Sequence, residues 1–134
     1  MALMVDASVF IHFERRGVPI DLSVWEPSED VFISVATVSE LLMGVHRADS
    51  EARRKRRSEF VEAILAGVSV LDFTIAVARR YAQVYAELSR QGRLIGAHDM
   101  IIAATALHHN LSLLTDNVEE FSRIAGLPVI PFGP

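Results

Sequence analysis

Short apolar runs alternate with helix-length amphipathic segments along this 134-residue chain. Short runs bounded by turn residues are typical of strands buried on both faces. We predict strands over Ala2–Val5, Val31–Ser34, Val68–Asp72, Leu111–Leu114 and Pro128–Pro131. We predict helices over Ser8–Arg16, Ala36–Arg47, Ser50–Leu65, Thr74–Gln91, His98–His109 and Asn117–Ile124. This alternation predicts a three-layer α/β/α fold, with a mostly parallel central sheet of four to five strands flanked by helices.

Two of the predicted helices differ in how they should be buried. Ala36–Arg47 carries an apolar stripe, which predicts an amphipathic helix with one face on the core. His98–His109 is apolar nearly all round, which predicts deep burial. The proline-containing segment Val18–Asp30 is expected to be mainly a connecting loop.

The composition fits one domain, residues 1–134, with 51% hydrophobic residues to fill its core. There is no cysteine, which excludes disulfides and thiolate zinc sites. The beginning of the chain does not resemble a secretory signal, and no run approaches the roughly 20 apolar residues of a membrane span, so we expect a cytoplasmic protein without membrane association. The net charge of −4 argues against non-specific coating of nucleic acid, but not against a nuclease that reaches phosphate through a metal ion.

Four carboxylates follow the predicted strands or open the predicted helices: Asp6, Glu40, Asp99 and Asp116. Such junctions lie along one edge of a parallel sheet, where binding sites form. At about 5 Å and an effective dielectric constant of about 20, each pair of like charges would cost roughly 3 kcal/mol. Hard divalent cations prefer oxygen ligands, so the pattern predicts a Mg²⁺ or Mn²⁺ site.

Each carboxylate also has a purely structural alternative. Asp6 suits the N-cap of the first helix, and Thr37–Glu40 matches a capping box. Asp99 would favour the positive end of its helix, and either Asp116 or Asn117 would cap the last one. The metal interpretation depends on all four acids meeting at one place.

Four segments in order carry a resemblance to a known family: Met4–Ser8, Ser39–Gly44, Gly96–Ala104 and Leu113–Asn117, followed by Phe121. With these motifs the chain resembles the PIN-domain family, and most closely the VapC toxins of toxin–antitoxin pairs. The resemblance implies a PIN-like fold over the whole chain and a Mg²⁺- or Mn²⁺-dependent endoribonuclease. It also implies a homodimer and a VapB-like antitoxin, which would wrap a groove near Phe10, Phe13, Leu41 and Leu42 and insert an arginine among the acids.

The resemblance assigns roles to the four acids. Asp6 and Asp99 would be the main metal ligands. Glu40 would bind metal directly or through water, or act as the general base, and Asp116 would complete the ligand set or hold a second ion. In-line attack by an activated water would cut the RNA phosphodiester.

The fourth motif departs from the family, in which the acid often stands two places after the threonine. Here that place, counted from Thr115, is Asn117, and Asp116 precedes it. We expect Asp116 to be the ligand and keep Asn117 as an alternative ligand or water holder. Thr115 would place its hydroxyl near the site.

Substrate-binding candidates are His98, beside Asp99, and Arg53 and Arg54 in the basic run 53–57. The alternative for that run is a solvated helix face with intrahelical partners such as Glu51. Two other functions stay open. A catalytically silent PIN-like interaction module would need no acid cluster, and a phosphoaspartate enzyme would want an acid where Ser8 stands.

Overall fold

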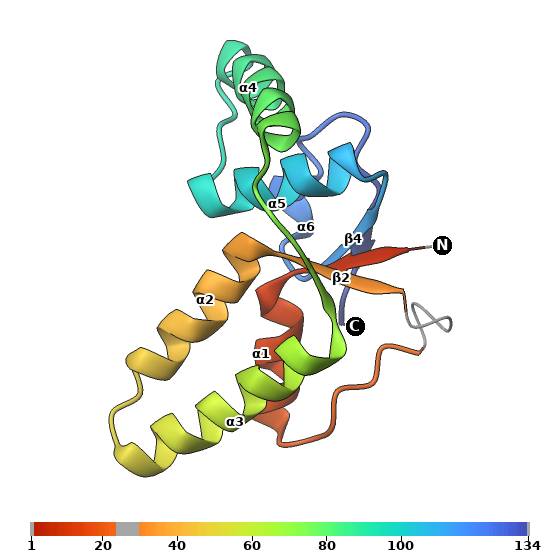
Figure 1. Cartoon of the computed structure of the whole chain (residues 1–134). Helices are drawn as coiled ribbons and strands as arrows, with labels where there is room; N and C mark the ends of the chain where they lie inside the picture. Colours follow the sequence, from red (N-terminus) through yellow and green to blue (C-terminus); the bar gives the residue numbers. More distant parts are fainter. Residues whose placement is uncertain (1, 24–29, 134) are drawn as a thin grey trace.

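The computed structural model describes residues 2–23 and 30–133 (Figure 1). The strands are β1 (Leu3–Val5), β2 (Val31–Ser34), β3 (Ser69–Leu71), β4 (Ser112–Thr115) and β5 (Val129–Pro131). The helices are α1 (Ala7–Arg16), α2 (Val35–His46), α3 (Glu51–Gly67), α4 (Ile75–Arg90), α5 (Ala97–His108) and α6 (Val118–Phe121). Every predicted strand and helix is present, with its ends shifted by three residues or fewer.

The five strands form one parallel sheet in the order β3-β2-β1-β4-β5. Met4 of β1 is in register with Phe32 of β2 on one side and Leu113 of β4 on the other. The chain builds outward from β1 to β2 and β3, and then returns to β4 and β5 on the other side. β1 is therefore the point at which the strand order reverses, where α/β sheets form their binding sites.

Side chains alternate across the sheet and divide the core into two layers. Leu3 and Val5 of β1 pack with residues of α1, α2 and α3, whereas Met4 packs with residues of α4 and α5. Figure 1 shows the first three helices below the sheet and α4 and α5 above it. The predicted three-layer α/β/α fold is confirmed.

Helix α5 is the most deeply buried helix of the upper layer, as its all-round apolar sequence predicts. Seven of its residues are buried: Met100, Ile102, Ala103, Ala104, Thr105, Ala106 and Leu107. Its first turn remains at the surface. The buried body of α5 therefore gives that turn a fixed position at the carboxyl edge of the sheet.

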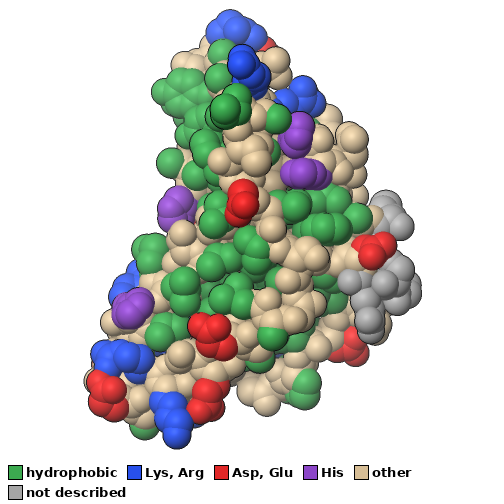
Figure 2. All heavy atoms as spheres, viewed as in Figure 1, with side chains coloured by type: hydrophobic (Ala, Val, Ile, Leu, Met, Phe, Trp, Pro, Cys, Tyr) green, Lys and Arg blue, Asp and Glu red, His purple; other side chains and the backbone are tan. Residues whose placement is uncertain are grey.

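Helices α2 and α3 form a hairpin that projects away from the sheet (Figure 1). Charged side chains gather at the outer end of this hairpin (Figure 2). Residues 18–23 of the predicted loop form neither helix nor strand, and residues 24–29 lie outside the described residues. None of the described helices is both long and apolar enough to span a membrane.

Candidate active site

Asp6 lies at the carboxyl end of the central strand and is only 6% exposed. As the structural alternative predicts, it is the N-cap of α1, and its Oδ1 accepts a hydrogen bond of 2.9 Å from the Ala7 N–H. Its Oδ2 accepts hydrogen bonds from the hydroxyls of Ser8, at 3.1 Å, and Thr115, at 2.7 Å. Burial raises the pKa of Asp6, and these hydrogen bonds oppose that rise. The carboxylate is held firmly, yet its charge is costly.

Thr115 joins the end of β4 to the end of β1. Its side chain is fully buried, and its hydroxyl donates to Asp6 while accepting a hydrogen bond of 3.0 Å from the Asn117 N–H. The hydroxyl thus fixes both the orientation of the Asp6 carboxylate and the turn that leads into α6. This placement agrees with the expectation that Thr115 lies near the site.

Glu40 is not part of a capping box, so that structural alternative is wrong. Ser34 caps α2 instead, because its hydroxyl accepts a hydrogen bond of 3.1 Å from the Ala36 N–H. The Thr37 hydroxyl is buried without a hydrogen bond to any described residue, and so is Oε1 of Glu40. Burial, followed by the negative charge of Asp6, raises the pKa of Glu40 to about 7.

Asp99 lies in the first turn of α5, as predicted. Burial is the main cause that raises its pKa to about 7, and the charges of Asp6, Glu40 and Glu120 add to it. The neighbouring Glu120 carboxyl also raises the pKa by its side-chain interaction with Asp99. The two acids therefore lie near enough to influence each other.

Glu120 is a further acid beside Asp99 that the sequence reasoning did not single out. It lies on α6, is half-buried, and its Oε2 accepts a hydrogen bond of 3.1 Å from Nδ2 of Asn117. Asp116, the predicted fourth acid, is exposed; its charge acts on Asp6, and its N–H contacts the Ser8 hydroxyl at 3.4 Å. Phe121, the next residue, is fully buried and shows that α6 packs on the core, but it does not show that Glu120 lies beside Asp99.

The acids around Asp6 influence one another, but their side chains do not form a ready-made metal site. Among residues 2–23 and 30–133, no three His, Asp or Glu side chains converge closely enough to hold an ion. The donor chemistry does fit a hard cation, because the groups are carboxylates with raised pKa values and Glu40 has an unsatisfied oxygen. The site therefore has the ligand types, but not the converged geometry, of a metal centre.

The fold and these acids can be compared with known proteins. The sequence model of the PIN domain matches residues 3–127. The chain belongs to the PIN-domain family. A relative from Rickettsia felis named ribonuclease VapC1 is 39% identical over 97% of this chain and 96% of its own length. The tRNA(fMet)-specific endonuclease VapC of Shigella flexneri is 37% identical over 71% of this chain and 70% of its own.

Solved PIN-domain structures share the fold over nearly the full chain. The FitAcB complex of Neisseria gonorrhoeae has a TM-score of 0.81 and 32% identity, with 96% of each chain covered. DNA-bound VapBC of Salmonella typhimurium has a TM-score of 0.84 and 27% identity, with 98% of each chain covered. Both are similar in fold to this PIN domain over nearly its whole length.

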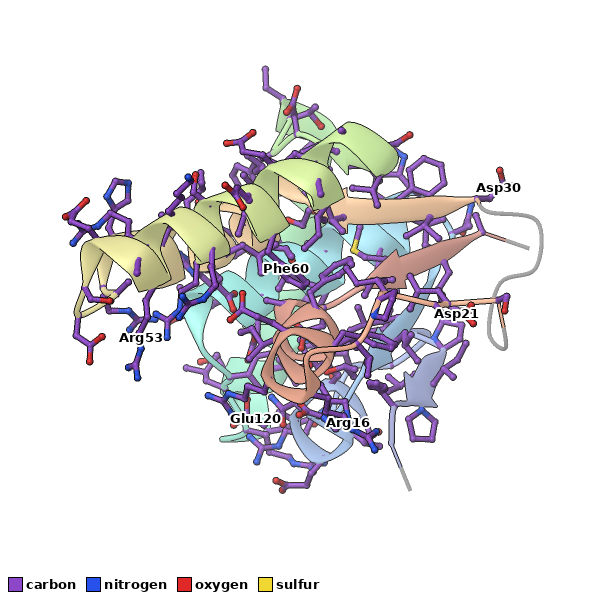
Figure 3. All side chains as sticks on the ribbon, turned by 90° about the horizontal axis from the view of Figure 1, so that it is seen from below. Arg16, Asp21, Asp30, Arg53, Phe60 and Glu120 are labelled. Carbon is purple, nitrogen blue, oxygen red and sulfur yellow. The ribbon has the colours of Figure 1, made fainter. Side chains whose placement is uncertain are left out.

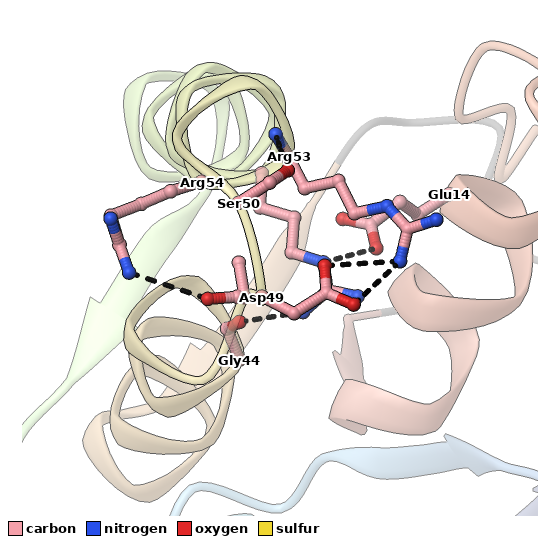
Figure 4. Close-up of polar contacts among 8 residues, drawn as sticks. Glu14, Gly44, Asp49, Ser50, Arg53 and Arg54 are labelled. Atoms are coloured by element: carbon pink, nitrogen blue, oxygen red, sulfur yellow. Dashed lines mark hydrogen bonds and ion pairs between the residues drawn. The ribbon is translucent and has the colours of Figure 1, made fainter.

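Of the three residues predicted to bind substrate, one lies beside the acids and two lie away from them. His98 is exposed at the rim of the site, where its Nδ1 lies 3.6 Å from Oε1 of Glu40. Arg53 pairs with both carboxylate oxygens of Asp49 at 3.1 Å (Figure 4). Arg54 pairs with Glu51. Figure 3 shows Arg53 at the outer end of α3, well apart from Glu120. His98 thus adjoins the acids, whereas the two arginines lie outside the site.

The four residues expected to contact the antitoxin differ in exposure: two are buried and two are half-buried. Phe10 and Leu41 are buried in the core, 1% and 5% exposed, so neither offers a docking surface. Phe13 and Leu42 are half-buried, and the Phe13 ring stacks on Phe132 with centroids 5.6 Å apart. A partner that used this region would contact the second pair.

Proposed function

We propose that this PIN domain is a metal-dependent endoribonuclease that acts as the toxin of a toxin–antitoxin pair. The observation that carries the proposal is the group of Asp6, Glu40, Asp99 and Glu120 where the strand order reverses, with Glu40 and Asp99 both at a pKa of about 7. The names of the relatives, ribonuclease VapC1 and tRNA(fMet)-specific endonuclease, support RNA as the substrate.

Asp6 and Asp99 would hold Mg²⁺ or Mn²⁺, with Glu120 in the place expected for Asp116. A bound ion of this kind activates water and neutralises charge on the scissile phosphate. Glu40, at a pKa of about 7, can accept a proton from the attacking water near neutral pH. Thr115 keeps the Asp6 carboxylate oriented, and Asn117 does the same for Glu120.

The two candidates for the fourth acid can be separated by neutral substitutions. We expect Glu120→Gln to lower the rate of RNA cleavage about 100-fold, because the Glu120 carboxylate acts on Asp99 and would share the ion with it. Asp116→Asn, the matched control, should change the rate less than about threefold. Initial rates on one RNA in Mg²⁺ measure both. A large loss in Asp116→Asn with an active Glu120→Gln would return the fourth role to Asp116.

We also propose a VapB-like antitoxin and a homodimer. The partner names in the solved VapBC complexes support the antitoxin. An arginine from that partner would fit among the acids, because charge-assisted bonds from a guanidinium satisfy carboxylates that otherwise repel one another.

One observation favours a second candidate, a non-catalytic interaction module: the described side chains hold no converged three-ligand group. Expression of the chain alone in a bacterial host separates the two. The nuclease proposal predicts growth arrest, fragmented cellular RNA, and relief of both by Asp99→Asn. Arrest that persists in Asp99→Asn, with intact RNA, would favour the interaction module.

A further inference from the structure

A groove lined by arginines opens directly beside Glu40. It lies between α1, α2 and α3. Its polar lining is Arg15, Arg47 and Arg57 with Glu14 and Glu40, and Gly44 and three apolar residues complete it. Glu40, Gly44 and Arg47 are spaced at i, i+4 and i+7 along α2, so they share one face over a rise of about 10 Å. The groove therefore leads from the candidate active site toward the outer end of the α2–α3 hairpin.

Arg57 is fixed in this groove by contacts with two other helices. Its Nη1 donates a hydrogen bond of 2.9 Å to the Gly44 carbonyl, and its Nε lies 3.9 Å from Oε1 of Glu14 (Figure 4). A Cβ added at Gly44 would meet nothing within 4 Å, so the floor of the groove at this residue is bare backbone. The Arg57 guanidinium is therefore fixed in position, and no side chain covers the backbone at Gly44 beneath it.

Arg15 and Arg47 supply charge that the fold leaves unneutralised. Both are exposed, and neither forms an ion pair or a side-chain hydrogen bond with the residues that the structure describes. A second hollow shares Glu14, Arg15 and Arg57 with the groove and adds Arg53, which is paired with Asp49, and Arg56. The positive surface thus continues from Glu40 along α3.

The local positive charge of this groove is suited to bind a polyanion. The chain as a whole has a net charge of −4 and an acidic site, so its overall field repels RNA, and binding needs a local positive surface. A planar guanidinium binds phosphate oxygens in a fork, and a contiguous run of them tracks a nucleic-acid backbone. Resting on the proposed function, we propose that Arg15, Arg47 and Arg57 bind the phosphates of the single-stranded RNA that flank the bond cut beside Glu40.

RNA affinity measured in chelator tests the groove without cleavage. We would compare Arg15→Gln/Arg47→Gln with Arg79→Gln/Arg80→Gln, which removes the same charge from exposed positions on α4, across the sheet. By fluorescence anisotropy with a labelled single-stranded RNA, the groove variant should bind about tenfold more weakly. Its dependence of log K on log salt should be shallower by about 1.4, or about 0.7 for each phosphate that an arginine no longer neutralises. The α4 variant should match the wild type.

The proposal would be overturned if the groove variant kept its RNA affinity, or if both variants lost affinity equally. Binding of polyglutamate is measured on the same variants. If the groove variant keeps its RNA affinity but loses polyglutamate binding, the groove would be assigned to an acidic protein segment. Circular dichroism checks that both variants are folded. Failure of the nuclease proposal would appear separately, as absence of cleavage by the wild-type protein in Mg²⁺, and would leave this binding comparison valid.

Discussion

Replacing Asp6 by asparagine is expected to lower RNA cleavage by about three orders of magnitude while leaving the fold intact. Asparagine caps helices as well as aspartate does, so the hydrogen bond from the Ala7 N–H is retained. The Thr115 hydroxyl can accept from the new amide. Because burial and the charge of Asp116 raise the pKa of Asp6, the neutral side chain should be at least as stable in metal-free buffer.

Asp6→Ala is the matched comparison for this prediction. Alanine removes the cap and the acceptor for Ser8 and Thr115 together, and should cost about 2 kcal/mol or more of stability in addition to activity. Denaturant unfolding and initial cleavage rates separate the two effects. If Asp6→Asn keeps full activity, or loses stability as Asp6→Ala does, Asp6 is only a structural cap.

The second large effect is on stability as the pH changes. Glu40 and Asp99 have ordinary pKa values of 4.5 and 3.8, and both are raised to about 7 in the folded protein. Between about pH 4 and pH 7 the folded state therefore keeps protons that the unfolded chain has released. The free energy of unfolding must fall across this window and level off above it. After allowance for solvent screening, we expect a loss of about 3 kcal/mol, or roughly 10 °C in Tm.

Thermal unfolding in chelator from pH 4.5 to 8 measures this loss. Glu40→Gln/Asp99→Asn should flatten the profile, because neither replacement titrates. Added Mg²⁺ should raise Tm most above pH 7, where the carboxylates are charged and available as ligands. A wild-type profile that is flat or rises with pH would show that the acids are not strained, and an absence of any Mg²⁺ effect would argue against the metal site.

Most of the fold follows from local patterns, because each buried strand is a short apolar run and each helix has a clear stripe or cap. Asp6 follows in the same way, since the ends of parallel strands meet at one edge. Asp99 follows from its place in the first turn of a helix that is apolar nearly all round. Glu120 could not be predicted in this way, because its influence on Asp99 depends on where the short helix α6 packs after β4. The start of α2 was predicted to within one residue, but its cap was not, because Ser34 and not Thr37 caps the helix.

Sequence spacing alone does not show which basic side chains remain available to bind a ligand. The run 53–57 is basic at every position, yet Arg53 and Arg54 pair with acids next to the start of α3, whereas Arg57 reaches Gly44 on α2 and Glu14 on α1. Arg15 and Arg47, which are isolated in the sequence, are brought together beside Glu40 only by the packing of α1 against α2. Tertiary contacts decide which of these cations remain available.

The central claim is that the acids around Asp6 cut RNA with the help of a divalent ion. The most direct test is cleavage of total cellular RNA by the purified, partner-free protein in Mg²⁺ or Mn²⁺, in chelator, and with Asp99→Asn alongside. We expect discrete fragments that appear only with the ion and disappear in the variant. Fragments that persist in chelator or in Asp99→Asn, or no cleavage by a folded protein with either ion, would contradict the account.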